Sequence, residues 1–150
     1  MNEKNKKLEE ICAEAMAKYL PKDVDNDGDI DITYCNLALN EIALLYCGIK
    51  DFKGKLANQI YELLKSDARW MPINGESAQL NSIKGHFCIA AQQNNPHGHV
   101  ATVLPRGLVY SSKWQKYVPM VANVGKRNGA MGVNFAFRSE PDYFMWMGKP

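Results

Sequence analysis

The sequence lacks long hydrophobic runs. No stretch reaches the roughly 18 apolar residues that a membrane-spanning helix needs, and residues 1–20 lack the apolar centre of a secretory signal. We therefore expect no membrane partner, no signal peptide and synthesis in the cytoplasm.

Strong net charge is also lacking, because 18 Lys and Arg residues nearly balance 16 Asp and Glu residues and leave a net charge of +2. The basic residues are scattered, and the run at residues 4–7 lies beside acidic residues, which is typical of a solvated helix face. A nucleic-acid-binding protein would gather its basic residues into a patch. We therefore expect no nucleic-acid partner.

Cysteine is scarce, with four residues in the chain. Cys12 and Cys47 fall at core positions of helical patterns, and Cys88 lies in the apolar run HFCIAA, so we expect these three to be free and buried. That use of cysteine is consistent with a reducing compartment. Cys35 differs from the others because it lies in the first turn of an expected helix.

The length of 150 residues suits one domain, residues 1–150, with a single core, and we expect a monomer. Apolar residues recur at helical spacing over residues 3–20, 35–48 and 54–65, and a polar turn is expected around residues 74–75. After residue 84 the chain consists of short β-branched and aromatic segments separated by turn residues, which indicates one antiparallel sheet. These segments are 86–92, 99–105, 108–112, 117–124 and 132–137, and the aromatic segment 141–148 receives no assignment. The order predicts an α+β fold, with N-terminal helices packed on a C-terminal antiparallel sheet.

An acidic stretch between the first two helices follows the EF-hand loop pattern D-x-[DN]-x-[DN]-G. Alternate residues of such a loop point oxygens at a hard cation, and the glycine permits a sharp turn. The twelfth place holds Tyr34 instead of a bidentate Glu, so a complete cage needs water or a ligand from elsewhere. The matching residues are Asp23, Asp25, Asp27, Gly28, Asp29 and Asp31.

A solvated acidic turn is the alternative interpretation of this stretch. Five aspartates in nine residues repel one another unless a cation neutralises them, which favours bound Ca²⁺. The expected ligands are the side chains of Asp23, Asp25, Asp27 and Asp31 and the backbone carbonyl of Asp29. Because only one such loop is visible, we expect a structural calcium rather than a paired calcium sensor.

Cys35 is a candidate nucleophile, since a thiol at a helix N-terminus feels the partial positive charge of free amides, which lowers its pKa. The alternative is a small core residue. A base is needed, and His99 is the best candidate because it begins an apolar strand after Gly98, whose missing side chain would let another group approach the imidazole. His97 lies in a polar turn, and His86 is equally consistent with an ordinary sheet residue.

A third group must orient the imidazole. Asn123, at the end of the segment 117–124, is the first choice, and Glu140 and Asp142 are weaker ones. The alternative for Asn123 is a turn former before Gly125.

These motifs resemble the CHAP amidase and peptidase family and the related NlpC-type cell-wall hydrolases, most specifically in TYCN at 33–36 and GHVATV at 98–103. The resemblance implies a compact papain-like domain with Cys35 as nucleophile, His99 as base and Asn123 as orienter. It also implies that the Cys35 backbone amide meets the oxyanion, with Tyr34 or Asn36 as side-chain donors. Some CHAP domains of phage lysins carry a calcium site just before the catalytic cysteine, which the acidic stretch resembles.

The expected function is a cysteine-dependent amidase or endopeptidase that cleaves peptidoglycan through a thioester acyl-enzyme, at the cell wall after release or export. One alternative is a non-catalytic, calcium-stabilised binding module with a buried Cys35. Another is a thiol protease or deamidase that acts on a protein substrate.

Overall fold

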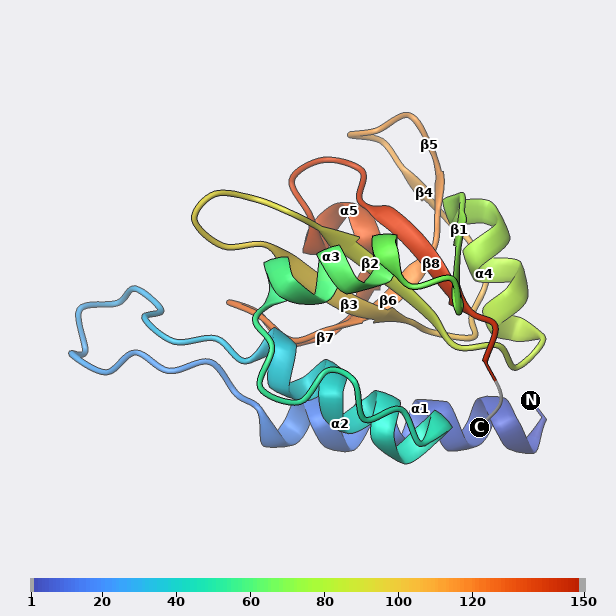
Figure 1. Cartoon of the computed structure of the whole chain (residues 1–150). Helices are drawn as coiled ribbons and strands as arrows, with labels where there is room; N and C mark the ends of the chain where they lie inside the picture. The colour runs from blue at the N-terminus through green and yellow to red at the C-terminus, as the bar shows by residue number, and fades with distance from the viewer. Residues whose placement is uncertain (1, 149–150) are drawn as a thin grey trace.

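Helices dominate the first half of the chain in the computed structural model, which describes residues 2–148 (Figure 1). α1 begins after Asn2, whose side chain accepts a hydrogen bond from the backbone amide of Asn5 (2.8 Å). α2 ends at Gly48, which adopts the left-handed conformation with φ of 69°. The helices are α1 (Glu3–Lys18), α2 (Cys35–Cys47), α3 (Ala57–Ser66), α4 (Gly75–Ile83) and α5 (Val133–Ala136).

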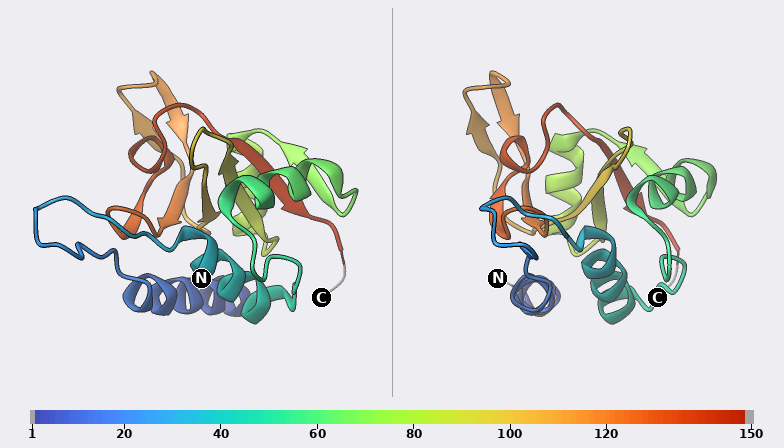
Figure 2. Two further views of the ribbon diagram at one scale, coloured as in Figure 1. Left: turned by 60° about the vertical axis from the view of Figure 1, so that its left-hand side comes forward. Right: turned by 90° about the vertical axis from the view of Figure 1, so that its left-hand side faces the viewer.

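An antiparallel sheet of six strands, in the order β1-β8-β2-β3-β6-β7, forms the centre of the fold, as the α+β prediction requires. The β4–β5 pair forms a separate hairpin that projects from the sheet (Figures 1 and 2). The strands are β1 (Trp70–Ile73), β2 (Cys88–Gln92), β3 (His99–Val103), β4 (Val109–Ser111), β5 (Lys116–Val118), β6 (Met120–Asn123), β7 (Gly129–Gly132) and β8 (Asp142–Trp146).

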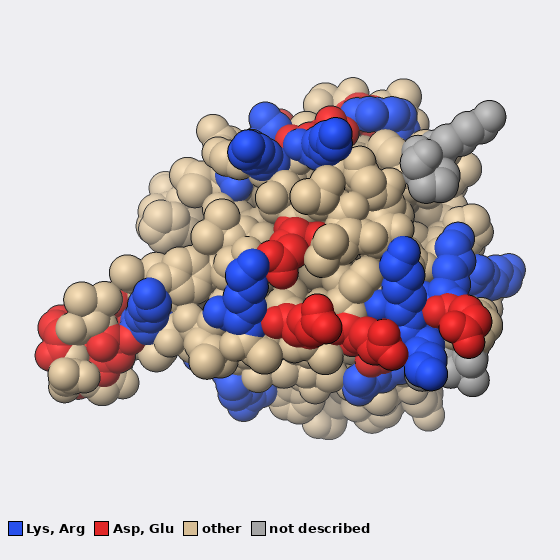
Figure 3. Space-filling view, turned by 90° about the horizontal axis from the view of Figure 1, so that it is seen from below, with Lys and Arg blue, Asp and Glu red and all other residues tan. Residues whose placement is uncertain are grey.

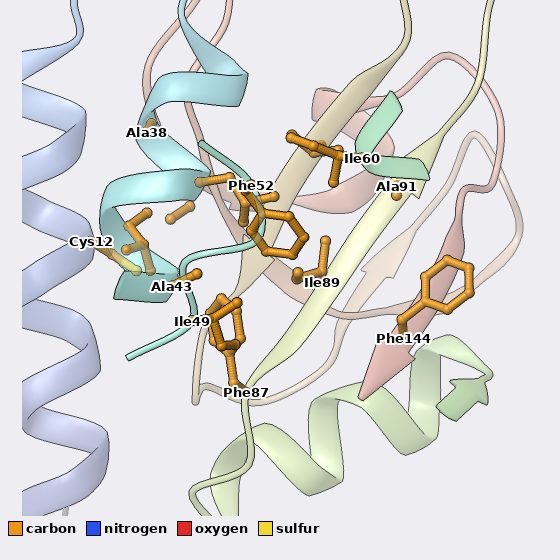
Figure 4. Packing of buried hydrophobic residues seen from close by; sticks show 14 of the residues in the cluster. Cys12, Ala38, Ala43, Ile49, Phe52, Ile60, Phe87, Ile89, Ala91 and Phe144 are labelled. Carbon is orange, nitrogen blue, oxygen red and sulfur yellow. The ribbon is translucent and has the colours of Figure 1, made fainter. Parts of the chain in front are cut away.

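The sheet is covered on both faces, and the alternating side chains of β2 show this directly. Ile89 and Ala91 pack into a core with α1, α2 and α3, which lie on one face (Figure 4). Cys88 and Ala90 pack into a second core with α4, α5 and the β4–β5 hairpin on the other face. Because both faces are buried, β2 is a continuous apolar run, as central strands with two covered faces are.

The prediction of a strand over residues 132–137 is wrong. β7 ends at Gly132, and the next residues form the short helix α5. Val133 and Phe137 are buried at helical spacing, whereas Phe135 between them is 69% exposed. A strand would place all three side chains on one face, so the pattern V-x-F-x-F fits both periods and only packing decides between them.

The expected polar turn at residues 74–75 is instead the start of α4, where the Asn74 side chain accepts a hydrogen bond from the Ser77 amide (2.7 Å). The sequence did not predict this helix, because two residues on its buried face are polar and interrupt the apolar pattern. Gln79 donates to the carbonyl of Leu104 (2.7 Å), and Ser82 donates to the carbonyl of Val103 (3.1 Å). The unassigned segment 141–148 contains β8, which lies between β1 and β2 inside the sheet.

Residues 20–33, called here the acidic arm, project from the body between α1 and α2 (Figure 1). Lys22 and Ile32 pair at its base, where the amide of Lys22 donates to the carbonyl of Ile32 (2.9 Å). Within residues 2–148, no helix combines the length and the apolar character that crossing a membrane requires.

Candidate active site

His99 and Asn123 meet where two neighbouring strands of the sheet begin and end, because of the register between these strands. β3 and β6 run antiparallel with Thr102 opposite Ala122, so the start of β3 lies beside the end of β6. His99 is the first residue of β3 and Asn123 is the last of β6. Their side chains are joined by a hydrogen bond of 2.6 Å between His99 Nε2 and Asn123 Oδ1.

A second hydrogen bond fixes the direction of the first. Asn123 Nδ2 donates to the backbone carbonyl of Arg127 (2.8 Å), which leaves Oδ1 as the atom that faces His99. Because this oxygen only accepts, His99 Nε2 must carry the proton and Nδ1 is left with a free lone pair. A general base needs that tautomer when its target proton lies on the Nδ1 side.

Cys35 is the first residue of α2 and is half-buried. It lines a narrow apolar hollow between α2 and the strands β3 and β6, together with Ala38, Val100 and Ala122. The backbone of Val100, the residue directly after His99, lies close enough to the Cys35 thiol to lower its pKa by hydrogen bonding. The fold therefore places Cys35 beside the start of the strand that carries His99.

Burial shifts the pKa of both groups in the direction that favours the neutral form. It raises the pKa of the Cys35 thiol, and the backbone amides of Val100 and Asn36 offset this only in part. The expectation that the helix N-terminus lowers this pKa below its usual value is therefore wrong. Burial also lowers the pKa of His99, against the opposing effect of the hydrogen bond to Asn123. Both shifts favour a protonated thiol beside a neutral imidazole, the pairing in which a histidine can act as a general base.

Two further residues hold the His99 ring in place. Phe137 packs on the ring with a centroid distance of 4.8 Å and an interplanar angle of 55°. On another side, a Cβ on Gly125 would lie 3.3 Å from His99 Cε1 and 3.4 Å from Asn123 Nδ2. Phe137 was not a candidate from the sequence, since it ended a segment assigned as a strand.

The weaker candidates for the orienting residue lie elsewhere. Glu140 is exposed and forms an ion pair with Lys116 (2.8 Å). Asp142 accepts a hydrogen bond from the hydroxyl of Tyr61 on α3. His97 and His86 are both exposed. Asn123 is thus the one candidate orienter that the fold brings to His99.

The side-chain donors that the resemblance implies for the oxyanion are engaged away from the thiol. The Asn36 amide donates to the carbonyl of Lys55 (3.1 Å). The Tyr34 ring packs against Tyr19 with a centroid distance of 6.3 Å, and Lys22 Nζ lies 5.8 Å from the centre of the same ring. The amides in the first turn of α2, including that of Cys35, have no partner within the helix and remain as donors.

Four aspartates of the acidic arm gather as the sequence predicts. One carboxylate oxygen from each of them lies within 4.8 Å of the others, and the Asp29 carboxylate is outside this group. Gly28 makes the sharp turn with φ of 92° and donates its amide to Asp23 (2.9 Å). The cluster could hold a metal ion and consists of Asp23, Asp25, Asp27 and Asp31.

The aspartate cluster lies in the projecting arm, apart from the hollow beside Cys35. Figure 3 shows it as an acidic group at the end of the projection. Desolvation raises the pKa of Asp23, but hydrogen bonds from the amides of Gly28 and Asp27 outweigh it and the net shift is downward. Tyr34, at the twelfth place of the loop pattern, packs on α1 and is the point where the base of the arm reaches α2.

No protein-family model matches the chain, and no curated protein matches it. The likeness to the CHAP and NlpC group therefore stays a prediction from the two motifs quoted above.

Gly98 is required because Asn58 and the Gln92 backbone pack closely against it, and not because a group approaches the imidazole as the sequence suggested. A Cβ there would lie 2.3 Å from Asn58 Oδ1 and 2.5 Å from the backbone carbonyl of Gln92, so the group that approaches is not a partner of the imidazole. We expect Gly98→Ala to lower the free energy of unfolding by about 1–3 kcal/mol, measured by urea denaturation. Gly107→Ala, with no atom within 4 Å of the added Cβ, is the matched control. Equal stability of both variants would contradict this packing.

The raised pKa of the Cys35 thiol predicts how its alkylation depends on pH. Because only the thiolate reacts, the rate of labelling by iodoacetamide should rise about tenfold per pH unit from pH 6 to pH 8. Mass spectrometry of the peptide that contains Cys35 measures this rate, and His99→Ala should slow it. Cys47, whose pKa burial raises to about 11, is the internal reference. A rate that is already constant near pH 6 would show a thiolate–imidazolium pair instead.

Proposed function

We propose that the protein is a cysteine-dependent amide hydrolase with Cys35 as nucleophile, His99 as base and Asn123 as orienter. The hydrogen bond between His99 and Asn123, with its direction fixed by the Arg127 carbonyl, carries this proposal. It leaves Nδ1 of the half-buried imidazole unprotonated, on a strand that packs against the helix whose first residue is Cys35. A histidine with a purely structural role does not need this combination.

In the proposed reaction, His99 Nδ1 takes the thiol proton as Cys35 Sγ attacks the amide carbonyl. The free amides in the first turn of α2 stabilise the oxyanion. The C–N bond breaks, the amine leaves with the proton from the imidazolium, and a thioester remains on Cys35. Water then attacks the thioester with His99 as base, which releases a carboxylate and regenerates the thiol.

The proposed substrate is a peptide or lactyl amide bond of peptidoglycan, at the cell wall after release or export. The motifs TYCN and GHVATV support this choice, since they resemble those of cell-wall hydrolases. Cys35 of the first motif begins α2 and His99 of the second begins β3, two elements that pack against each other.

We further propose that the acidic arm binds Ca²⁺ through the side chains of Asp23, Asp25, Asp27 and Asp31 and the carbonyl of Asp29. The convergence of four carboxylates within 4.8 Å supports this, because such a group repels itself without a cation. The Tyr34 ring packs against Tyr19, so the twelfth ligand would come from water or from elsewhere in the protein. Bound calcium would order the arm, and no step of the reaction passes through it.

The half-burial of Cys35 and the raised pKa of its thiol favour a second candidate, a non-catalytic binding module stabilised by calcium. In such a module Cys35 would alkylate no faster than Cys47, and His99→Ala would leave its rate unchanged. The labelling experiment described above therefore separates the two candidates.

Cys35→Ala tests the proposed reaction. We expect it to abolish the release of soluble fragments from purified peptidoglycan, measured by mass spectrometry, which also identifies the bond cleaved. Cys47→Ala, at the other end of α2, is the matched control and should keep wild-type activity. Thermal unfolding of both variants should show that they fold. Fragment release by folded Cys35→Ala would rule out this nucleophile.

The arm predicts a response of stability to calcium. At a free Ca²⁺ concentration 100-fold above the dissociation constant, the free energy of unfolding should rise by about 2.7 kcal/mol, with a higher Tm. Asp27→Asn should remove most of this gain, because its carboxylate belongs to the cluster. Asp29→Asn should keep it, because that residue is proposed to act through its carbonyl. A Tm that is unchanged by Ca²⁺ and by chelator would contradict the calcium site.

A further inference from the structure

The turn between β6 and β7, residues 124–128, is fastened to the end of α1 by one side chain. Asn128 Nδ2 donates to the backbone carbonyls of Met16 and Tyr19, both at 2.9 Å. These carbonyls belong to the last turn of α1, where no further helical amides exist to satisfy them. Asn128 is half-buried, lies more than 100 residues from its partners and caps this helix end.

The same side chain also braces the turn from within. Asn128 Oδ1 accepts a hydrogen bond from the backbone amide of Gly125 (3.0 Å). Gly125 is the residue against the His99 and Asn123 side chains, so the amide that Asn128 holds belongs to the wall of the site. The three hydrogen bonds of Asn128 together fix the position of the turn at residues 124–128.

The turn at residues 124–128 determines which end of the Asn123 carboxamide faces His99. The carbonyl of Arg127, directly before Asn128, accepts from Asn123 Nδ2 (2.8 Å). Without that carbonyl, the carboxamide gains little from either orientation, and Nδ2 could face His99 as a donor. With a donor opposite it, His99 Nε2 would no longer favour the protonated state. Part of the molecules would then carry the proton on Nδ1 and lack the lone pair that the proposed base needs there.

We infer that Asn128 is a positioning residue, which sets the tautomer of His99 by holding the Arg127 carbonyl against Asn123. The inference rests on the proposed function for its consequence in catalysis, but the tautomer itself can be measured without any substrate. Asn128 touches no reacting atom. Its effect reaches the imidazole through two intermediate groups, the turn carbonyl and the Asn123 carboxamide.

The test is Asn128→Ala, read first by the ¹⁵N chemical shifts of the His99 ring at pH 7.5. The wild type should show the Nε2–H tautomer alone, and the variant should show a mixture of the two tautomers. On purified peptidoglycan, kcat should fall by about tenfold to a hundredfold while KM stays unchanged. Asn128→Ser, which keeps a short hydroxyl but cannot span to α1, should behave in the same way and takes the place of Asn128→Ala if that variant does not fold.

Asn81→Ala is the matched control, since Asn81 is also half-buried and donates its amide to the carbonyl of Ser77 (2.9 Å) on α4, away from the site. It should keep both the wild-type tautomer and the wild-type kcat. A folded Asn128 variant that keeps the single Nε2–H tautomer would overturn the inference and reduce Asn128 to a cap of α1. Absence of peptidoglycan cleavage by the wild type would instead overturn the proposed function, and the ring shifts would still decide the role of Asn128.

Discussion

The hydrogen bond between His99 and Asn123 is the interaction on which the rest of the site depends. The antiparallel register of β3 and β6 brings the two residues together at the ends of these strands, and a shift of one strand by one residue would turn its side chain to the face opposite its partner. The Arg127 carbonyl then fixes the direction of the bond. Phe137 and Gly125 close the space around the ring, so the imidazole has one position and one tautomer.

Cys35, the proposed nucleophile, comes from a different part of the chain and depends on a different interaction. α2 packs against β3 through its apolar face, and this packing carries Cys35 to the strand that begins at His99. The same burial that positions the thiol also raises its pKa and lowers that of His99. Both shifts favour the neutral forms, and the proposed reaction uses them, with the imidazole accepting the proton that the thiol holds.

The sequence predicted the parts of the molecule that depend on local pattern. The α+β order, the main helices, Gly28 in the acidic turn and the pairing of His99 with Asn123 all follow from periodicity, turn chemistry or strand ends. What could not be predicted depends on tertiary packing. α4 buries Gln79 and Ser82, which carry no apolar signal, because strand carbonyls satisfy them. The pKa of Cys35 follows its burial rather than its place on the helix, and the role of Asn128 requires contacts more than 100 residues away.

The covalent intermediate provides the most direct measurement of the central claim, that Cys35 acts as a nucleophile supported by His99 and Asn123. Samples from a single turnover on solubilised peptidoglycan, quenched in acid, can be digested and mapped by mass spectrometry. The account predicts that the peptide containing Cys35 gains the mass of the acyl fragment and loses it on treatment with hydroxylamine. Fragment release with Cys35 unmodified at every time point would contradict the account.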